Sequence, residues 1–148
     1  MSKVTIISNT GNQATANYDV SKIFVFNNRY ESAALNNSEY DPMIMPAGTV
    51  MGRIAGSNTL FPCYSKATDG SQYPIGILSA DVSILDGTTL IVPICVSGDV
   101  VQDKIVFFNP SDTLSTVVSG RTMFDRIGSD TVGIKIVPNN ENTYLDNQ

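Results

Sequence analysis

The sequence contains no histidine and no tryptophan, and only two of its 148 residues are cysteine. Histidine is the commonest general base and the usual partner of a serine or cysteine nucleophile, so its absence removes the most frequent catalytic arrangements. Without histidine, two cysteines also lack the ligands that would complete a metal site. We therefore expect no catalytic site, no bound metal and no cofactor.

Basic residues and long apolar runs are scarce as well. Nine Lys and Arg stand against fourteen Asp and Glu, which gives a net charge of -5. Nucleic acids and anionic membranes are bound by clustered Lys and Arg, and the basic residues here are scattered. No apolar run approaches the roughly 20 residues that span a bilayer, and the first residues lack a secretory apolar segment. These features predict a protein made in a cytoplasm, with no nucleic acid, membrane or small-molecule substrate as partner.

The two cysteines, Cys63 and Cys95, each lie within an apolar, strand-like run. A disulfide needs Cα atoms within about 7 Å of each other, and the spacing in sequence does not establish such a distance. The positions favour two small buried hydrophobic side chains.

The stretch from Met45 to Leu78 organises the rest of the chain, because it predicts three short strands separated by turns. Gly52 interrupts the first strand, as a bulge or a site of close approach does, and Gly76 stands in the third where a side chain would lie between neighbours. Asp69-Gly70 supplies a turn pair with positive backbone angles. The expected strands are residues 49–54, 60–64 and 75–78, with a turn at residues 56–58 between the first two.

Five glycine-containing phrases stand out, three in this stretch and two beyond it. They are Ala47-Gly48-Thr49-Val50-Met51-Gly52, Ala67-Thr68-Asp69-Gly70-Ser71, Pro74-Ile75-Gly76-Ile77-Leu78, Val96-Ser97-Gly98-Asp99-Val100 and Val132-Gly133-Ile134-Lys135-Ile136-Val137. These phrases resemble those of the head decoration proteins of tailed phages, the family of the lambda head decoration protein D. The resemblance covers roughly residues 45 to 137 and implies a small homotrimer that binds the outside of a mature phage capsid, contacts the major capsid protein and cements the shell. The core and turn positions of this motif are Gly48, Gly52, Asp69, Gly70, Gly76 and Gly98.

Residues 1–44 form an extended N-terminal arm by this interpretation, since they are rich in asparagine and lack evenly spaced apolar faces. Two β-prone segments within the arm have no partner of their own there. An unpaired strand tethered to a compact domain suits β-augmentation of a partner sheet, although the segments could instead join the sheet of their own domain. The capsid-binding residues expected in the arm are Val4, Ile6, Ile7, Ile23, Phe24, Val25 and Phe26.

Further along the chain, Asp86-Gly87 predicts a hairpin between strands at 82–85 and 88–92. Pro93 lies inside the apolar run that follows. Because proline cannot donate to a ladder, its strand is expected at a sheet edge or a bulge, where a neighbouring subunit or its arm could cover it.

A helix is expected after Asn109-Pro110, which resemble an N-cap and a first helical residue. Apolar residues recur at three- and four-residue steps as far as Ile127, and Gly128 is placed as a stop. The pattern allows a kink or a break at Gly120. A last strand is expected over residues 131–137, followed by an Asn-rich tail at 139–148.

Taken together, the sequence predicts a β-rich α+β protein with a small, partly barrel-like β domain, one packed helix and an extended N-terminal arm. The expected divisions are the arm at 1–44, the decoration-protein β core at 45–138 and the tail at 139–148. The expected role is a structural capsid cement located on the virion surface. No enzymatic activity is expected.

Two other functions remain open. The first is a carbohydrate- or receptor-binding head-fibre module that holds a glycan with tyrosines and acidic turns. The second is an enzyme dependent on Asp69 or Asp81, which with Asp86 could form a carboxylate cluster. Asp69 and Asp86 precede glycines, however, and aspartate is favoured at such turn positions for backbone reasons alone. The tyrosines are Tyr18, Tyr30, Tyr40, Tyr64, Tyr73 and Tyr144.

Overall fold

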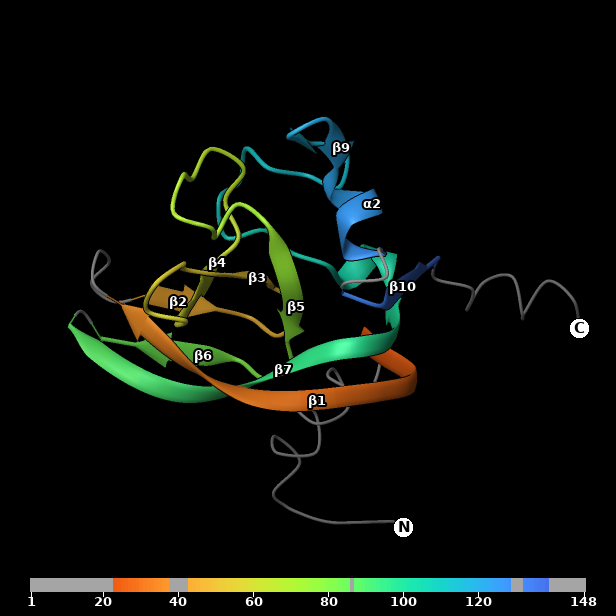
Figure 1. The fold of residues 1–148 in the computed structure, drawn as a ribbon. Helices are drawn as coiled ribbons and strands as arrows, with labels where there is room; N and C mark the ends of the chain where they lie inside the picture. The colour runs from red at the N-terminus through yellow and green to blue at the C-terminus, as the bar shows by residue number, and fades with distance from the viewer. Residues whose placement is uncertain (1–22, 38–42, 86, 129–131, 139–148) are drawn as a thin grey trace, which may run out of the picture.

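A computed structural model describes residues 23–37, 43–85, 87–128 and 132–138, and nearly all of its regular structure is β-strand (Figure 1). A single short α-helix, α2 (Met123–Ile127), and a 3-10 turn, η1 (Gln102–Lys104), complete the described part. The strands are β1 (Phe24–Asn37), β2 (Met43–Met45), β3 (Val50–Arg53), β4 (Leu60–Pro62), β5 (Pro74–Leu78), β6 (Val82–Ile84), β7 (Thr88–Val101), β8 (Val117–Val118), β9 (Arg121–Thr122) and β10 (Ile134–Val137).

Five of these strands close into a barrel. The ladder runs in the order β1-β4-β3-β5-β7, and β7 pairs again with β1, so the ring has no free edge within it. β10 extends the sheet by pairing in parallel with β7. The long strands β1 and β7 form a curved two-stranded ribbon along one side of the barrel (Figure 1). The expected small, barrel-like β domain with one packed helix is confirmed.

The barrel interior holds one of two apolar cores. Its side chains come from the inward-facing positions of the barrel strands, and the small β2–β6 sheet adds four more. Burial of apolar side chains from strands so far apart in sequence is the main driving force for closing the ring. The buried members are Leu35, Met43, Met45, Met51, Leu60, Leu78, Val82, Ile84, Val92 and Ile94.

The second core lies on the outer face of β3, β5 and β7, where α2 and β10 cover the barrel. Val50 and Ile77 belong to this core, whereas their chain neighbours Met51 and Leu78 belong to the first. This split follows from the period of two along a strand, which sends successive side chains to opposite faces. β3 and β5 are therefore buried on both sides.

The central strand predictions are confirmed. β3 and β4 form an antiparallel hairpin, and β3 pairs on its other side with β5. The β3–β5 register shifts between Met51 and Gly52, so Gly52 marks a bulge as expected. Gly70 has the positive φ, +105°, that the Asp69-Gly70 turn requires.

The expected boundary of the arm at residue 44 is wrong, because residues 24–37 are a barrel strand. β1 pairs antiparallel with β7 from Phe24 opposite Val100 to Asn37 opposite Thr88. This pairing satisfies backbone groups that a free arm would leave for a partner. The alternative in which the segment joins its own sheet therefore holds for residues 24–26. Val4, Ile6 and Ile7 lie outside the described residues.

The hairpin expected at Asp86-Gly87 does not form. Both strands exist, but β6 pairs with β2 and β7 pairs with β1 and β5. The turn is marked by the Thr88 N–H, which donates to the Leu85 carbonyl (3.3 Å), and Asp86 itself lies outside the described residues. Closure of the barrel by β7 has overridden the local turn signal.

Pro93 does not lie on an edge strand, since β7 is paired with β1 at this point and Pro93 stands opposite Ser32. On its other side β5 ends with Leu78 opposite Ile94, and the Ser79 N–H donates to the Pro93 carbonyl (3.1 Å). Pro93 therefore lies just beyond the end of β5, where its lack of an N–H removes few hydrogen bonds from the ladder. The subunit contact expected at this residue stays a prediction.

The long helix expected after Pro110 is also wrong, because only Met123–Ile127 are α-helical. Asn109 does not cap a helix, and its side chain instead accepts from the Ser111 N–H (3.0 Å) in a local turn. Ser119 and Gly120 then take positive φ values and reverse the chain between β8 and β9. Local side-chain bonds and this reversal prevent the apolar spacing from becoming one helix.

Candidate functional site

The start of β1 presents two contrasting pairs of side chains. Ile23 and Phe24 are buried in the second core at 7% exposure each, whereas Val25 and Phe26 are 47% and 68% exposed. The Phe24 ring also makes an edge-to-face contact with Tyr30, with centroids 5.8 Å apart. The first pair fixes the entry of the chain into the barrel, and the second pair offers apolar surface beside that entry.

A bulge in β1 produces this arrangement. The register with β7 shifts between Phe24 and Phe26 and again before Arg29, and Asn27 adopts a positive φ of +55°. Gly98 lies directly against the bulge, because a Cβ there would be 2.6 Å from the Asn27 carbonyl oxygen. Its own φ is +105°, so only glycine fits both the space and the backbone.

The other motif positions lie around the central strands and do not gather into a reactive site. The backbone approaches them closely, which accounts for glycine at these places without a chemical role. The contacts that a Cβ would meet are the Lys104 carbonyl at Gly48, the Ser71 carbonyl at Gly52, the Arg53 carbonyl at Gly70 and the Cys95 carbonyl at Gly76.

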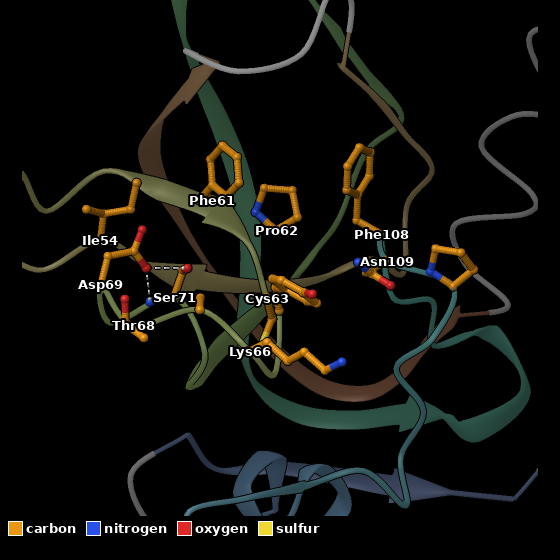
Figure 2. A pocket seen from close by; sticks show the side chains of 13 residues that line it. Ile54, Phe61, Pro62, Cys63, Lys66, Thr68, Asp69, Ser71, Phe108 and Asn109 are labelled. Atoms are coloured by element: carbon orange, nitrogen blue, oxygen red, sulfur yellow. Dashed lines mark hydrogen bonds between the residues drawn. The ribbon is translucent and has the colours of Figure 1, made fainter.

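A pocket of about 490 Å³ opens beside the motif (Figure 2). Asp69 and Tyr64 both line it, and so do aromatic and proline side chains from two distant segments. The Asp69 carboxylate accepts from the Ser71 hydroxyl (2.6 Å) and from the Ser71 N–H (3.0 Å). These hydrogen bonds hold the pKa of the Asp69 carboxyl below its ordinary value. The ionised carboxylate therefore stabilises the turn. Besides Tyr64, the apolar and aromatic lining residues are Ile54, Phe61, Pro62, Cys63, Ala67, Phe108 and Pro110.

Sequence reasoning missed this pocket because its walls come from β4, the loop after β4 and the segment after η1. Phe61 and Phe108 have no common pattern in the sequence that would place them together. Only Asp69 and Tyr64 could have been singled out in advance, and they were expected as a turn residue and a stacking platform.

Other candidates for chemistry have structural roles. Asp81 accepts a hydrogen bond from the Ala47 N–H (2.8 Å), which ties the start of the motif to the segment after β5. Cys63 and Cys95 are free and buried, as expected. Burial, with a smaller effect from the Asp112 charge, raises the pKa of the Cys63 thiol to about 12. Burial likewise raises the pKa of Cys95.

In the part of the chain that the structure describes, no three His, Cys, Asp or Glu side chains lie close enough together to hold a metal ion. Among the same residues, no helix has the length and apolar character needed to cross a bilayer.

Comparison with known families agrees with the motif. The family described as bacteriophage lambda head decoration protein D matches residues 31–116, more than half of the chain. The match runs from the middle of β1 to the loop before β8 and includes β2 to β7 entirely. No curated protein matches the sequence.

Proposed function

The chain belongs to the family of the bacteriophage lambda head decoration protein D, and from this premise we propose that it binds the outer surface of a mature phage head as a homotrimer and stabilises the shell. The family is structural, and its members decorate phage capsids. The finer proposal adds the trimer, the contact with the major capsid protein and the cementing effect.

The observation that supports this proposal is the contrast between buried and exposed side chains at the start of β1. Ile23 and Phe24 anchor the chain in the core while Val25 and Phe26 leave apolar surface exposed next to the point where residues 1–22 attach. A coat subunit that buries these two side chains gains about 25 cal/mol for each Å² of apolar area removed from water. We propose that this surface and the β-prone residues Val4, Ile6 and Ile7 together contact the shell.

A trimer would stay bound to the shell even if the contact made by each subunit is weak. Once one subunit has docked, the other two face their sites at an effective concentration of roughly millimolar. Fixing a leading peptide costs on the order of 1 to 2 kcal/mol for each ordered residue, so each single contact should be modest. If the capsid edge that binds the leading segment appears only after the shell has expanded, the protein would join the head late in assembly.

Deletion of residues 1–20 tests the proposal. The truncated protein keeps Ile23 and the whole of β1, so we expect it to remain a folded trimer by analytical ultracentrifugation and circular dichroism. It should fail to decorate expanded heads that lack the native protein, as counted by electron microscopy. Decoration at undiminished occupancy would defeat the role of the leading segment, and a monomeric full-length protein would defeat the trimer.

A second candidate function, glycan or receptor binding, is favoured by the pocket in Figure 2. Its 490 Å³ lies within the range of small-ligand sites, and its lining includes the aromatic residue Tyr64 and the polar residues Lys66 and Asn109. A glycan array probed with the full-length protein separates the two functions. Binding that is lost in Tyr64→Ala, with head decoration unchanged, would establish the pocket as a site of its own.

A further inference from the structure

A second, smaller pocket of about 210 Å³ lies at the end of the barrel away from β2 and β6. The far end of β1 is fixed to β6 by the Asn37 side chain, which donates to the Ile84 carbonyl (3.0 Å). Six to eight residues before Asn37, the same strand contributes Arg29 and Glu31 to the pocket. Arg53 from β3 and Ile94 from β7 also line it.

Arg53 is the residue that this pocket leaves unsatisfied. Its Nε is the one buried side-chain nitrogen or oxygen without a hydrogen-bond partner among the residues that the structure describes. A guanidinium is always charged and carries only donors, so its Nε–H needs an acceptor, and no described residue supplies one. A buried donor without a partner is unfavourable, the more so when the group is charged.

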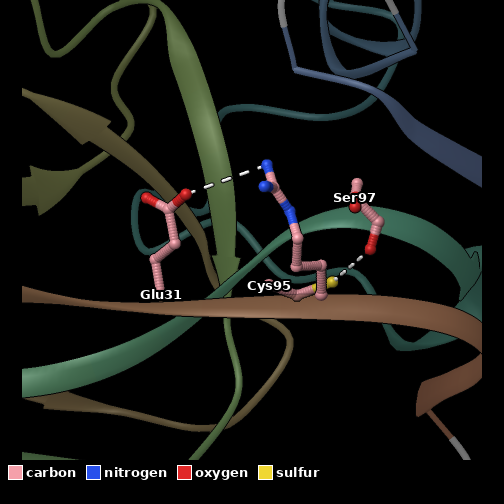
Figure 3. A network of polar contacts seen from close by, with 4 residues as sticks. Glu31, Cys95 and Ser97 are labelled. Carbon is pink, nitrogen blue, oxygen red and sulfur yellow. Dashed lines mark hydrogen bonds and ion pairs between the residues drawn. The ribbon is translucent and has the colours of Figure 1, made fainter.

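The neighbouring carboxylate does not meet this need. Glu31 forms its ion pair with Arg29 instead, at 3.8 Å between Oε2 and Nη2, with both side chains more than half exposed (Figure 3). Such an exposed and long pair contributes little. The pocket therefore holds two of the nine basic residues of an acidic protein, one of them with a buried and unused donor.

We propose that this pocket binds the carboxylate of an aspartate or glutamate side chain presented by a partner protein. A guanidinium matches the planar geometry of a carboxylate and can bind it through two parallel N–H groups. At 210 Å³ the pocket is smaller than the roughly 300 to 1,000 Å³ of small-molecule sites, so it fits one side chain better than a whole ligand. Glu31 disfavours a doubly charged anion such as phosphate, because like charges in one site repel.

The test is a nitrogen-15 NMR titration of the arginine Nε–H signals in the full-length protein. The probe is the capped peptide acetyl-Gly-Glu-Gly-amide, and its neutral counterpart contains Gln in place of Glu. The Arg53 signal should shift and saturate with the Glu peptide and stay unchanged with the Gln peptide at equal ionic strength. The Arg126 signal is the internal reference, because its Nε already donates to the Val118 carbonyl (2.9 Å).

Two variants separate binding from a general salt effect. R29Q should weaken binding of the Glu peptide about two- to fivefold, as expected for the loss of a partly exposed charge partner. E31Q should strengthen binding, because it removes the competing and repelling carboxylate. No saturable shift at Arg53, an equal response to the Gln peptide, or tighter binding of inorganic phosphate would overturn the proposal. Because no heads are used, these results do not depend on whether the protein decorates a capsid.

Discussion

The backbone carbonyl oxygen of Ser71 occupies the space in which a Cβ on Gly52 would stand. This contact places the turn after β4 against the bulge of β3. Ser71 is itself buried and holds the Asp69 carboxylate, so the bulge and the pocket wall are fixed together. The absence of a side chain at residue 52 is thus a packing requirement.

Gly52→Ala should destabilise the protein by about 1 to 3 kcal/mol, the usual cost of overpacking, because rigid backbone must move to admit the methyl group. Gly128→Ala is the matched control, since Gly128 also lacks a positive φ and its nearest contacts are ordinary ones of 3.5 and 3.6 Å. Urea unfolding of both variants measures the difference. Equal stability of the two would contradict the packing argument.

Replacing Val25 and Phe26 together by serine should lower the occupancy of the protein on heads while leaving its free energy of unfolding within about 0.5 kcal/mol of the native value. The reason is that both side chains are exposed and contribute little to the core. Val117→Ser controls for loss of apolar surface elsewhere, because Val117 is 61% exposed on β8. Occupancy that falls equally in both variants would argue against a contact at the start of β1.

Asp112→Ala should cost about 1.5 to 3 kcal/mol of stability, because a buried carboxylate and its two hydrogen bonds are lost. Asp112 is 6% exposed and accepts from the Ser65 hydroxyl (2.6 Å) and the Ser65 N–H (2.9 Å), which joins two loops 47 residues apart. Asp103→Ala, at an exposed position in η1, should change little. Thermal unfolding of the two variants gives the comparison.

The stability of the protein should decline in alkaline solution because of Cys63. Its pKa is raised from 9.0 to about 12 by burial, so the unfolded thiol ionises first as the pH rises. The contribution is complete below pH 9 and is lost between about pH 9 and pH 12, with a slope near 1.4 kcal/mol per pH unit. Urea midpoints at several pH values check this, and Cys63→Ala should show a shallower slope.

Labelling offers an independent readout of the same burial. A thiol reagent at pH 8 should modify Cys63 and Cys95 slowly in the folded protein and rapidly in urea, since only the thiolate reacts. Rapid labelling of the folded state would contradict the raised pKa of both groups.

The sequence predicted best where neighbours in the chain are neighbours in space. β3, β4 and β5 follow one another in the chain, and β4 and β5 both pair with β3, so local signals such as Gly52 and Asp69-Gly70 carried enough information. The glycine pattern also identified the family, because close backbone approaches tolerate no other residue.

Prediction failed where distant segments meet. β1 pairs with β7 and β6 pairs with β2, and neither pairing leaves a mark in the local pattern. The apolar spacing between Leu114 and Ile127 resembled a helix, yet the positive φ values of Ser119 and Gly120 divide it into a hairpin and a short helix. The pocket around Arg53 was missed for the same reason, since its walls come from separate strands.

The seam between β1 and β7 has a consequence for how the molecule is made. β1 belongs to the first part of the chain to leave the ribosome. It can pair with β4 once residues up to 62 have followed, but its pairing with β7 is complete only when residues up to 101 have followed. Long-range pairing of this kind is slow and leaves strand edges exposed in the meantime. The ring of the nascent protein therefore stays open until β7 has been synthesised.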